Sequence, residues 1–139
     1  MQDLRVEKIA TQNVVSVSPQ DSVIHAAQVM TKRNISSVLV VEDNLLGILT
    51  ERDIVQKIVA KEKNAFRTRV EEIMNTPVET IDLDESIMEA ARILRDKKIK
   101  KLVVTDGRKL WGMLSERDIL EADPALHNHY LKKKQLLGE

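Results

Sequence analysis

The sequence predicts a mixed α/β (α+β) fold, in which two β-α-β-β-α repeats pack pseudo-symmetrically through their sheets. Two observations carry this prediction. The halves of the 139-residue chain align with one another at a shift of 64 residues, and each half has the same order of strand and helix patterns. Because one half alone cannot bury much apolar surface, the halves are expected to pack together and to leave clefts between them.

The duplication extends over four blocks of sequence. "RVEKIA" (5–10) aligns with "RVEEIM" (69–74), "VSPQDSVIHAAQVM" (17–30) with "IDLDESIMEAARIL" (81–94), and "ISSVLVV" (35–41) with "IKKLVVT" (99–105). The phrase "GILTERD" (47–53) returns as "GMLSERD" (112–118), at a shift of 65 because one residue is inserted before it. We therefore divide the chain into a first repeat (5–63), a second repeat (69–122) and a C-terminal tail (123–139) that is expected to be helical.

Each repeat begins with a short β-branched strand, expected over residues 14–17 and 78–81, which is followed by an amphipathic helix. The helices are indicated by apolar residues at i, i+3, i+4 and i+7, from Val23 to Met30 and from Ile87 to Leu94. The sequence leaves the capping residues of these helices open. They are expected among Ser18, Pro19 and Asp21 for the first helix, and between Asp82 and Asp84 for the second.

Two more strands and a second helix complete each repeat. The strands are expected over 38–41 and 45–49, and over 102–105 and 110–114, with turn-like residues between them. The second helix begins at the repeated phrase, and Pro124 ends it in the second copy.

Composition excludes several functional classes. Lysine and arginine total 22, as do aspartate and glutamate, and this balance argues against a broad nucleic-acid-binding surface. The chain has no cysteine, which excludes disulfides and thiolate chemistry and agrees with a cytoplasmic location. No apolar run approaches the roughly 20 residues of a membrane span, and the N-terminus lacks the apolar stretch of a signal peptide.

The repeated phrase has two interpretations. Thr50-x-x-Asp53 and Ser115-x-x-Asp118 match a helix capping box, and Gly47 and Gly112 permit a close approach or a bulge. The same residues also suit a nucleotide. The free N–H groups of a helix start and the guanidinium groups of Arg52 and Arg117 favour phosphate, and an ionised carboxylate accepts hydrogen bonds from ribose hydroxyls.

Other candidate residues carry weaker signals. Lys97, Lys98, Lys100 and Lys101 are expected either to neutralise phosphates or to form a solvated helix end. His127 and His129 in the "HNH" of the tail, beside Lys132–Lys134, suit a solvated helix better than a metal site. No nucleophile–base pair and no repeated metal spacing is present, so the sequence predicts neither an enzyme nor a metalloprotein.

The two "G-h-h-[TS]-x-x-D" phrases, the β-α-β-β-α order and the strand sequences "ISSVLVV" and "IKKLVVT" together resemble a tandem pair of cystathionine-β-synthase (CBS) domains, a Bateman module. The resemblance covers residues 5–122. It implies a regulatory module, not a catalyst, that binds AMP, ADP, ATP or S-adenosylmethionine without a covalent cofactor. It also implies a homodimer, arranged as a disc of four repeats, that regulates an enzyme or transporter.

The resemblance also implies which residues bind the ligand. The motif aspartates, Asp53 and Asp118, would take the ribose hydroxyls, while Thr50 and Ser115 would lie near ribose and phosphate. One cleft would combine Gln12, Val14, Ile35 and Ser36 with Ser115, Arg117 and Asp118. The other would combine Thr76, Val78, Ile99 and Lys100 with Thr50, Arg52 and Asp53. Lys100 and Lys101 occupy positions of basic phosphate contacts in a related sensor, whereas the first repeat has Ser36 and Ser37 there, so the two clefts are expected to differ.

Two alternatives remain open at this point. One is a module that dimerises or docks on a partner without any ligand, and the other is nucleic-acid binding through the lysines at 97–101 and 132–134.

Overall fold

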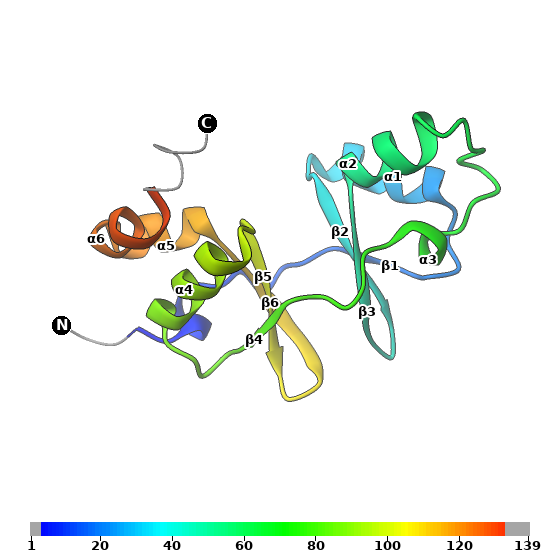
Figure 1. The fold of residues 1–139 in the computed structure, drawn as a ribbon. Helices are drawn as coiled ribbons and strands as arrows, with labels where there is room; N and C mark the ends of the chain where they lie inside the picture. Colours follow the sequence, from blue (N-terminus) through cyan, green and yellow to red (C-terminus); the bar gives the residue numbers. More distant parts are fainter. Residues whose placement is uncertain (1–3, 133–139) are drawn as a thin grey trace. The chain divides into compact units, whose positions relative to one another are not determined.

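The computed structural model describes residues 4–132. These residues form two compact units, and each unit is built around its own three-stranded sheet (Figure 1). The first-repeat unit comprises residues 14–78. The second-repeat unit comprises the residues up to 13 together with those from 79 onward. The compact units therefore differ from the sequence repeats, because the short segment that starts each repeat belongs to the unit of the other repeat.

The first-repeat unit contains the predicted β-α-β-β-α order. Its elements are β1 (Ser16–Val17), α1 (Val23–Arg33), β2 (Ser37–Glu42), β3 (Asn44–Thr50), α2 (Glu51–Ile54) with its π-helical continuation η2 (Val55–Val59), and the short helix α3 (Val70–Ile73).

The second-repeat unit repeats this order and adds a helical tail. Its elements are the 3-10 turn η1 (Val6–Lys8), β4 (Thr80–Asp82), α4 (Ile87–Lys97), β5 (Lys101–Asp106), β6 (Lys109–Ser115), α5 (Glu116–Ala122), α6 (Pro124–His127) and the π-helical turn η3 (Asn128–Lys132).

The two sheets have the same topology, and this confirms the predicted fold class. In each, the first strand runs parallel to the central strand and the third strand runs antiparallel to it. The register is duplicated as well: Val38 faces Leu49 in one sheet, and Leu102 faces Leu114 in the other. Each hairpin also has a register shift after the second valine of its central strand, Val40 or Val104.

The caps of the long helices lie further along the chain than predicted, by one residue for α1 and by two for α4. Ser22 caps α1 and accepts a hydrogen bond from the backbone N–H of His25, and Ser86 caps α4 in the same way. The prediction of Ser18, Pro19 or Asp21, and of Asp82 or Asp84, was therefore wrong. Asp21 and Asp82 instead accept backbone N–H groups within the preceding turns, at 2.9 Å each, where they stabilise the turn rather than the helix.

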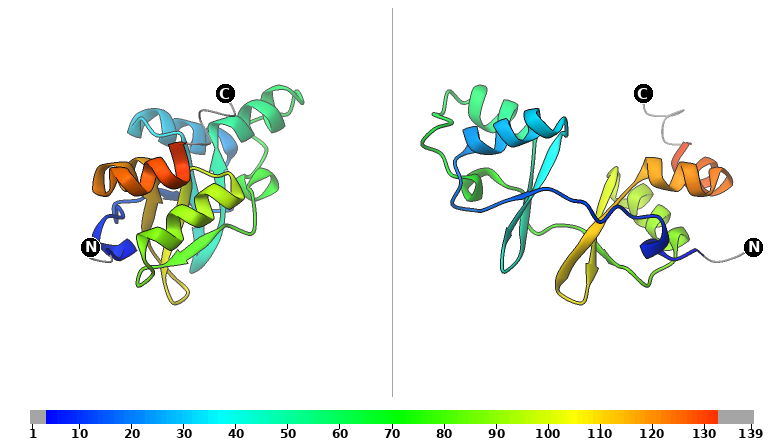
Figure 2. Two further views of the ribbon diagram at one scale, coloured as in Figure 1. Left: turned by 60° about the vertical axis from the view of Figure 1, so that its left-hand side comes forward. Right: turned by 180° about the vertical axis from the view of Figure 1, so that it is seen from behind.

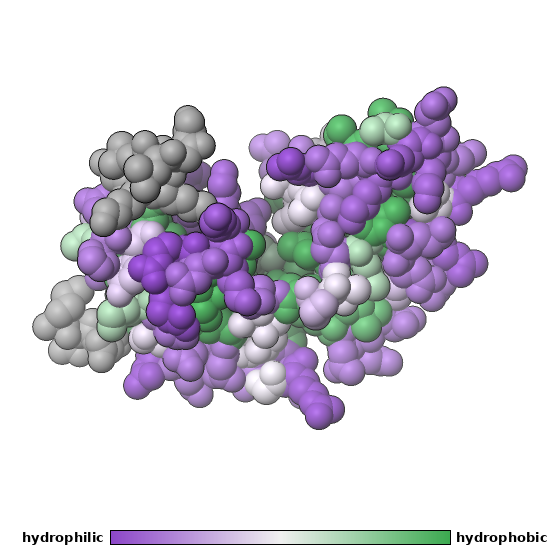
Figure 3. Space-filling view, in the orientation of Figure 1, coloured by the Kyte–Doolittle hydropathy of each residue, from purple (hydrophilic) through white to green (hydrophobic). Residues whose placement is uncertain are grey.

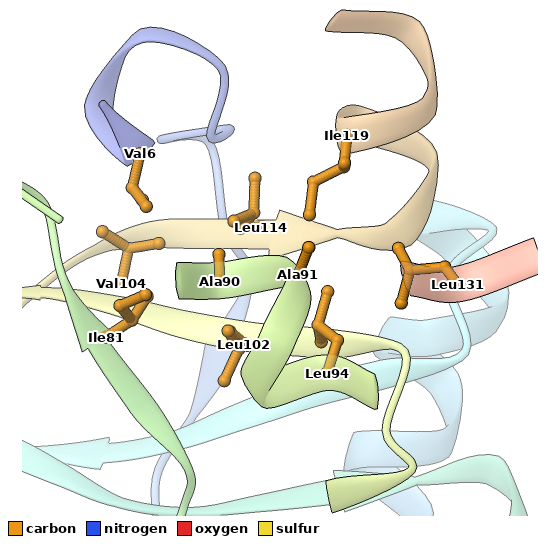
Figure 4. Packing of buried hydrophobic residues seen from close by; sticks show 10 residues of the cluster. All are labelled: Val6, Ile81, Ala90, Ala91, Leu94, Leu102, Val104, Leu114, Ile119 and Leu131. Atoms are coloured by element: carbon orange, nitrogen blue, oxygen red, sulfur yellow. The ribbon is translucent and has the colours of Figure 1, made fainter. Parts of the chain in front are cut away.

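Each unit has its own aliphatic core on the helix-covered face of its sheet. Figures 1 and 2 show α4 and α5 on the same face of the β4–β5–β6 sheet. In the second-repeat unit, Leu94 of α4 packs with Leu102, Leu114 and Ile119 (Figure 4). The first-repeat unit has an equivalent cluster of Val23, Ala26, Met30, Val38, Val40, Leu49, Ile58 and Val70 among others.

The segment that starts each repeat packs on the other repeat. Val6 is fully buried in the core of the second-repeat unit, and its N–H donates to the carbonyl of Glu85 at 2.8 Å. Its counterpart Val70 is fully buried in the first-repeat unit, where its N–H donates to the carbonyl of Asp21 at 2.8 Å. Each compact unit therefore takes one short segment from the neighbouring repeat.

The C-terminal tail begins as two short helical turns in the second-repeat unit. Asp123 caps α6 through the N–H of Leu126, and Leu131 is buried in the core. The guanidinium of Arg95 lies 5.0 Å from the ring centre of Tyr130. Residues 133–139 of the predicted tail, including Lys133 and Lys134, lie outside the described residues.

Candidate ligand-binding site

The repeated phrases lie at the same place in their units, where the last strand passes into a helix. The hydroxyl oxygen accepts the N–H of the aspartate three residues on, at 3.1 Å for Thr50 and 3.2 Å for Ser115. The carboxylates of Asp53 and Asp118 in turn accept the N–H of these residues, at 2.8 Å in both copies. Both phrases are therefore capping boxes, and the structural interpretation is confirmed.

The helix starts do not provide the free N–H groups expected from the sequence. The N–H of Glu51 donates to the carbonyl of Ser36 at 2.9 Å, and the N–H of Glu116 donates to that of Lys100 at 3.0 Å. Since the aspartate N–H is also taken, two of the first three N–H groups in each helix already have partners. A phosphate at either helix start would therefore need side-chain donors in addition to the backbone.

The glycine of each phrase lies under a crossing backbone segment. A Cβ atom on Gly112 would lie 2.5 Å from the carbonyl oxygen of Thr11, and one on Gly47 would lie 2.9 Å from that of Asn75. The crossing segments bond to the strands through paired backbone hydrogen bonds, Thr11 with Met113 and Asn75 with Ile48. The absence of a side chain thus permits the close approach that the sequence indicated.

The carboxylate of Asp53 is surrounded by donors of its own unit. Besides the Thr50 N–H, its Oδ2 accepts the hydroxyl of Thr50 at 2.9 Å and the side-chain amide of Asn75 at 2.7 Å. Its Oδ1 lies 3.3 Å from the Nζ of Lys57, one helical turn further on. The residue is 7% exposed, which makes it one of the few buried charged residues.

These donors determine the charge state of Asp53. Desolvation by burial raises the pKa of the carboxyl, but hydrogen bonds from Thr50, Asn75 and Lys57 stabilise its ionised form and outweigh burial. The net result is a pKa below the ordinary value of 3.8, so Asp53 is ionised at neutral pH.

The equivalent carboxylate of Asp118 has a more open environment. It is half-buried, and between Leu4 and Lys132 its one hydrogen-bond donor is the N–H of Ser115. Thr11 and Ala122 stand at the positions of Asn75 and Lys57, and neither donates a side-chain hydrogen bond to it. Most of the hydrogen-bonding capacity of this carboxylate is therefore available to a ligand.

Basic side chains lie beside the second phrase. Lys101 pairs with Ser115 across β5 and β6, whereas the first repeat has Ser37 opposite Thr50. Lys100, Lys101 and Arg117 are exposed, and none of them takes part in a salt bridge of the described chain. The second-repeat unit therefore combines an open carboxylate with unpaired cations.

The remaining predicted residues are divided between the units. Arg52 is exposed in the first turn of α2. The first-repeat unit also contains Val14, Ile35, Ser36, Thr76 and Val78, whereas Gln12 and Ile99 belong to the second-repeat unit. The combination of these residues into two clefts stays a prediction.

The sequence analysis missed Asn75 and Lys57. Lys57 stands four residues after Asp53, which is the spacing of ion pairs on a helix, so a helical reading of the phrase could have found it. Asn75 lies 22 residues from Asp53, and only the folded segment brings the two together.

Comparison with known proteins identifies the family. The family model described as "CBS domain" matches residues 6–60 and again residues 70–125. The chain belongs to the CBS domain family and contains a tandem pair of these domains.

Curated relatives include proteins from archaea and bacteria. An uncharacterized protein of Methanopyrus kandleri, MK0525, is 36% identical over 91% of this chain, and the match covers 66% of that protein. MJ1404 of Methanocaldococcus jannaschii is 34% identical, and the match covers 32% of its length. The CBS domain-containing protein YhcV of Bacillus subtilis is 30% identical, with 82% of this chain and 81% of YhcV covered.

Solved structures agree with this assignment. The CBS domain pair of protein MJ0100, in complex with 5'-methylthioadenosine and S-adenosyl-L-methionine, has a TM-score of 0.76 and 27% identity, with 87% of this chain and 96% of that chain covered. A hexameric CBS-CP12 protein from bloom-forming cyanobacteria also has a TM-score of 0.76, with 30% identity and coverage of 86% of this chain and 68% of that chain.

Proposed function

We propose that this chain is a regulatory module that binds adenosine nucleotides (AMP, ADP or ATP) and that Asp118 holds the ribose. The observation that carries the proposal is the open carboxylate of Asp118, which has one donor among residues 4–132 where Asp53 has four. The two adjacent hydroxyl groups of a ribose are both donors, and a carboxylate is an acceptor on both of its oxygens. A ribose therefore supplies the partners that Asp118 lacks.

The cations beside the second phrase support a phosphorylated ligand. Arg117 follows Ser115 by two residues, and Lys100 and Lys101 lie where β5 starts next to Ser115. A guanidinium and two ammonium groups that have no carboxylate partner within residues 4–132 favour the phosphates of a nucleotide. In this proposal Gln12 contributes from the same unit, and a role for Val14, Ile35 and Ser36 at the base stays a prediction.

S-adenosylmethionine is the second candidate ligand. A structurally similar CBS pair, that of MJ0100, was solved with this compound and with methylthioadenosine, both of which carry an adenosine ribose but no phosphate. The ribose role of Asp118 is the same for either ligand, whereas the lysines favour the nucleotides. A ligand-independent interaction module and nucleic-acid binding are the alternatives that the experiment below also tests.

The experiment is a thermal-shift titration with AMP, ADP, ATP and S-adenosylmethionine, with GTP to test selectivity for adenine. A ligand at 100 times its Kd stabilises the folded protein by roughly 2.7 kcal/mol, so binding raises the unfolding temperature measurably. We expect a nucleotide response in the wild type and its loss in Asp118→Asn, in which an amide replaces one acceptor oxygen by donors.

Asp123→Asn is the matched control, because Asp123 caps a helix of the same unit and has no proposed contact with the ligand. It should retain the full response. A folded wild type that responds to no adenosine compound would refute the proposal, and an unchanged response in Asp118→Asn would refute the ribose assignment.

The proposal includes regulation without catalysis, a homodimer and a cytoplasmic location. Exposed apolar side chains at equivalent positions support self-association: Val55 follows Asp53 by two residues, and Leu120 follows Asp118 by two. Their side chains are 58% and 42% exposed. The regulated partner would be an enzyme or a transporter. Within residues 4–132, no helix is long and apolar enough to cross a membrane.

A further inference from the structure

The two motif aspartates have the same sequence context but different surroundings. Asp53 Oδ2 accepts from the N–H and the hydroxyl of Thr50 and from the amide of Asn75, at 2.8, 2.9 and 2.7 Å. Its Oδ1 faces the ammonium of Lys57 at 3.3 Å. A carboxylate has about four lone-pair sites, two on each oxygen, so these donors saturate Oδ2 and occupy one of the two sites on Oδ1.

The side-chain donors Lys57 and Asn75 are themselves held in place. The Nζ of Lys57 donates to the side-chain oxygen of Asn75 at 3.1 Å and to the carbonyl of Ile73 at 2.9 Å. The backbone of Asn75 is fixed to that of Ile48 by two hydrogen bonds, at 2.8 and 3.1 Å. Asn75, Lys57 and Asp53 thus form a closed triangle, which we call the Asp53 latch.

A ligand diol gains little at an aspartate that already has this triangle of partners. To bind Asp53 through both carboxylate oxygens, a ribose diol must displace a donor from the saturated Oδ2, such as the Asn75 amide, so that a new hydrogen bond there replaces an existing one. Such an exchange is nearly neutral for the hydroxyl, and it also breaks one side of the Asn75–Lys57–Asp53 triangle. At Asp118 the ribose hydroxyls add hydrogen bonds without breaking any that are present.

The second repeat lacks both members of the latch. The backbone pairings Thr11 with Met113 and Asn75 with Ile48 are equivalent, so Thr11 occupies the place of Asn75. Ala122 occupies the place of Lys57, four residues after the motif aspartate. A methyl group replaces the ammonium, and the short, exposed side chain of Thr11 makes no hydrogen bond to Asp118.

We propose that Asn75 and Lys57 act as specificity-determining residues that close the Asp53 site to vicinal-diol ligands, so that this chain binds one adenosine ligand, at Asp118. The proposal rests on the function proposed above and adds to it the number of ligands per chain and the residues that set this number. The first repeat then serves a structural role, because the latch holds the 70–75 segment on its own unit.

Reciprocal exchange of the latch tests this proposal. Native mass spectrometry and titration calorimetry would count the molecules of AMP, ATP and S-adenosylmethionine bound per chain, with each compound titrated separately. We expect one per chain in the wild type. The double variant Asn75→Thr, Lys57→Ala gives the first repeat the residues of the second, and it should bind two.

Two further variants assign the sites. Adding Asp53→Asn to the double variant should return the count to one, because the new site needs the Asp53 carboxylate. The reverse exchange, Thr11→Asn with Ala122→Lys, should weaken binding at Asp118 by at least about tenfold. Circular dichroism and urea unfolding would verify that each variant is folded.

The outcomes separate the latch from the proposed function. Two ligands per chain in the wild type, or one in the folded Asn75→Thr, Lys57→Ala variant, would overturn the latch and leave adenosine binding in place. No binding of any of the three compounds by the wild type would overturn the proposed function and the latch with it.

Discussion

At the scale of single residues, the glycines of the repeated phrase have the clearest structural role. The carbonyl oxygen of Thr11 lies 2.5 Å from the position that a Cβ on Gly112 would take, and this oxygen belongs to backbone that is paired with Met113. Neither Thr11 nor the strand at Gly112 can move away without breaking the backbone hydrogen bonds between Thr11 and Met113. Any side chain at position 112 therefore displaces the N-terminal segment from the sheet.

We predict that Gly112→Ala lowers the free energy of unfolding by about 1–3 kcal/mol, as expected for overpacking in a closely packed region. Urea unfolding with intrinsic fluorescence of Trp111 would measure the change. The control is Gly107→Asn in the β5–β6 turn, where φ is +64° and the added Cβ meets no atom within 4 Å. Asparagine tolerates this backbone conformation, so the free energy of unfolding of the control should lie within about 0.5 kcal/mol of that of the wild type. An equal decrease in the free energy of unfolding of the two variants would contradict this account.

The residue scale also shows how far the sequence determines the site. The capping boxes at Thr50 and Ser115 are local, so the [ST]-x-x-[DE] pattern suffices to predict them. The latch on Asp53 depends on Asn75, which reaches it only because the 70–75 segment crosses β3. A difference between two similar motifs that comes from such a crossing is visible only in the folded chain.

At the scale of elements, the sequence predicted the order of strands and helices but not the helix starts. The apolar spacing that defines α1 and α4 is set by burial, and the structure agrees with it at Val23, Ala26 and Met30. Several polar residues precede each helix, and spacing alone does not decide which of them caps it. Ser22 and Ser86 occupy the capping positions, while Asp21 and Asp82 accept backbone hydrogen bonds in the turns before them.

The packing of the segment that starts each repeat on the other repeat also belongs to the scale of elements. The alignment of 5–10 with 69–74 indicates that both segments belong to the duplicated unit, but it does not indicate onto which sheet either one folds. The backbone bonds of Val6 to Glu85 and of Val70 to Asp21 determine this. The segment at the start of the first repeat packs on the second repeat, and the segment at the start of the second repeat packs on the first.

The helix that follows each phrase exposes apolar residues, and we predict that a second copy of the chain covers them. Val55 and Val59 of the first repeat are 58% and 67% exposed, and hydrophobic surface is visible over the α2–η2 helix in Figure 3. Leu120 is the counterpart of Val55. Val55→Glu with Leu120→Glu should convert a homodimer to a monomer in sedimentation velocity, because both changes place a charge on the buried face.

Phe66→Glu is the control for this experiment, since Phe66 is 73% exposed but lies in the loop before α3. It should leave the dimer intact. A wild type that sediments as a monomer at high concentration, or a dimer that persists in the double glutamate variant, would contradict the proposed dimer face.

At the scale of the whole molecule, composition and local chemistry give different information. The formal net charge of the chain is zero, yet Lys100, Lys101 and Arg117 lie beside the second phrase without acidic partners in the part of the chain that the structure describes. Overall charge balance therefore argues against a broad polyanion surface and not against a single phosphate-binding place. The sequence predicts two unequal sites from Lys100 and Lys101 against Ser36 and Ser37, and the different surroundings of Asp53 and Asp118 add a second inequality.

The central claim, that Asp118 recognises the ribose hydroxyls of an adenosine nucleotide, is tested most directly by titration calorimetry with ATP and with 2'-deoxy-ATP. The two ligands share base and phosphates and differ in one hydroxyl. We predict that the wild type binds ATP at least about tenfold more tightly than 2'-deoxy-ATP, a difference of about 1.4 kcal/mol, and that Asp118→Asn removes this preference. Equal affinities of the wild type for the two nucleotides would contradict the account.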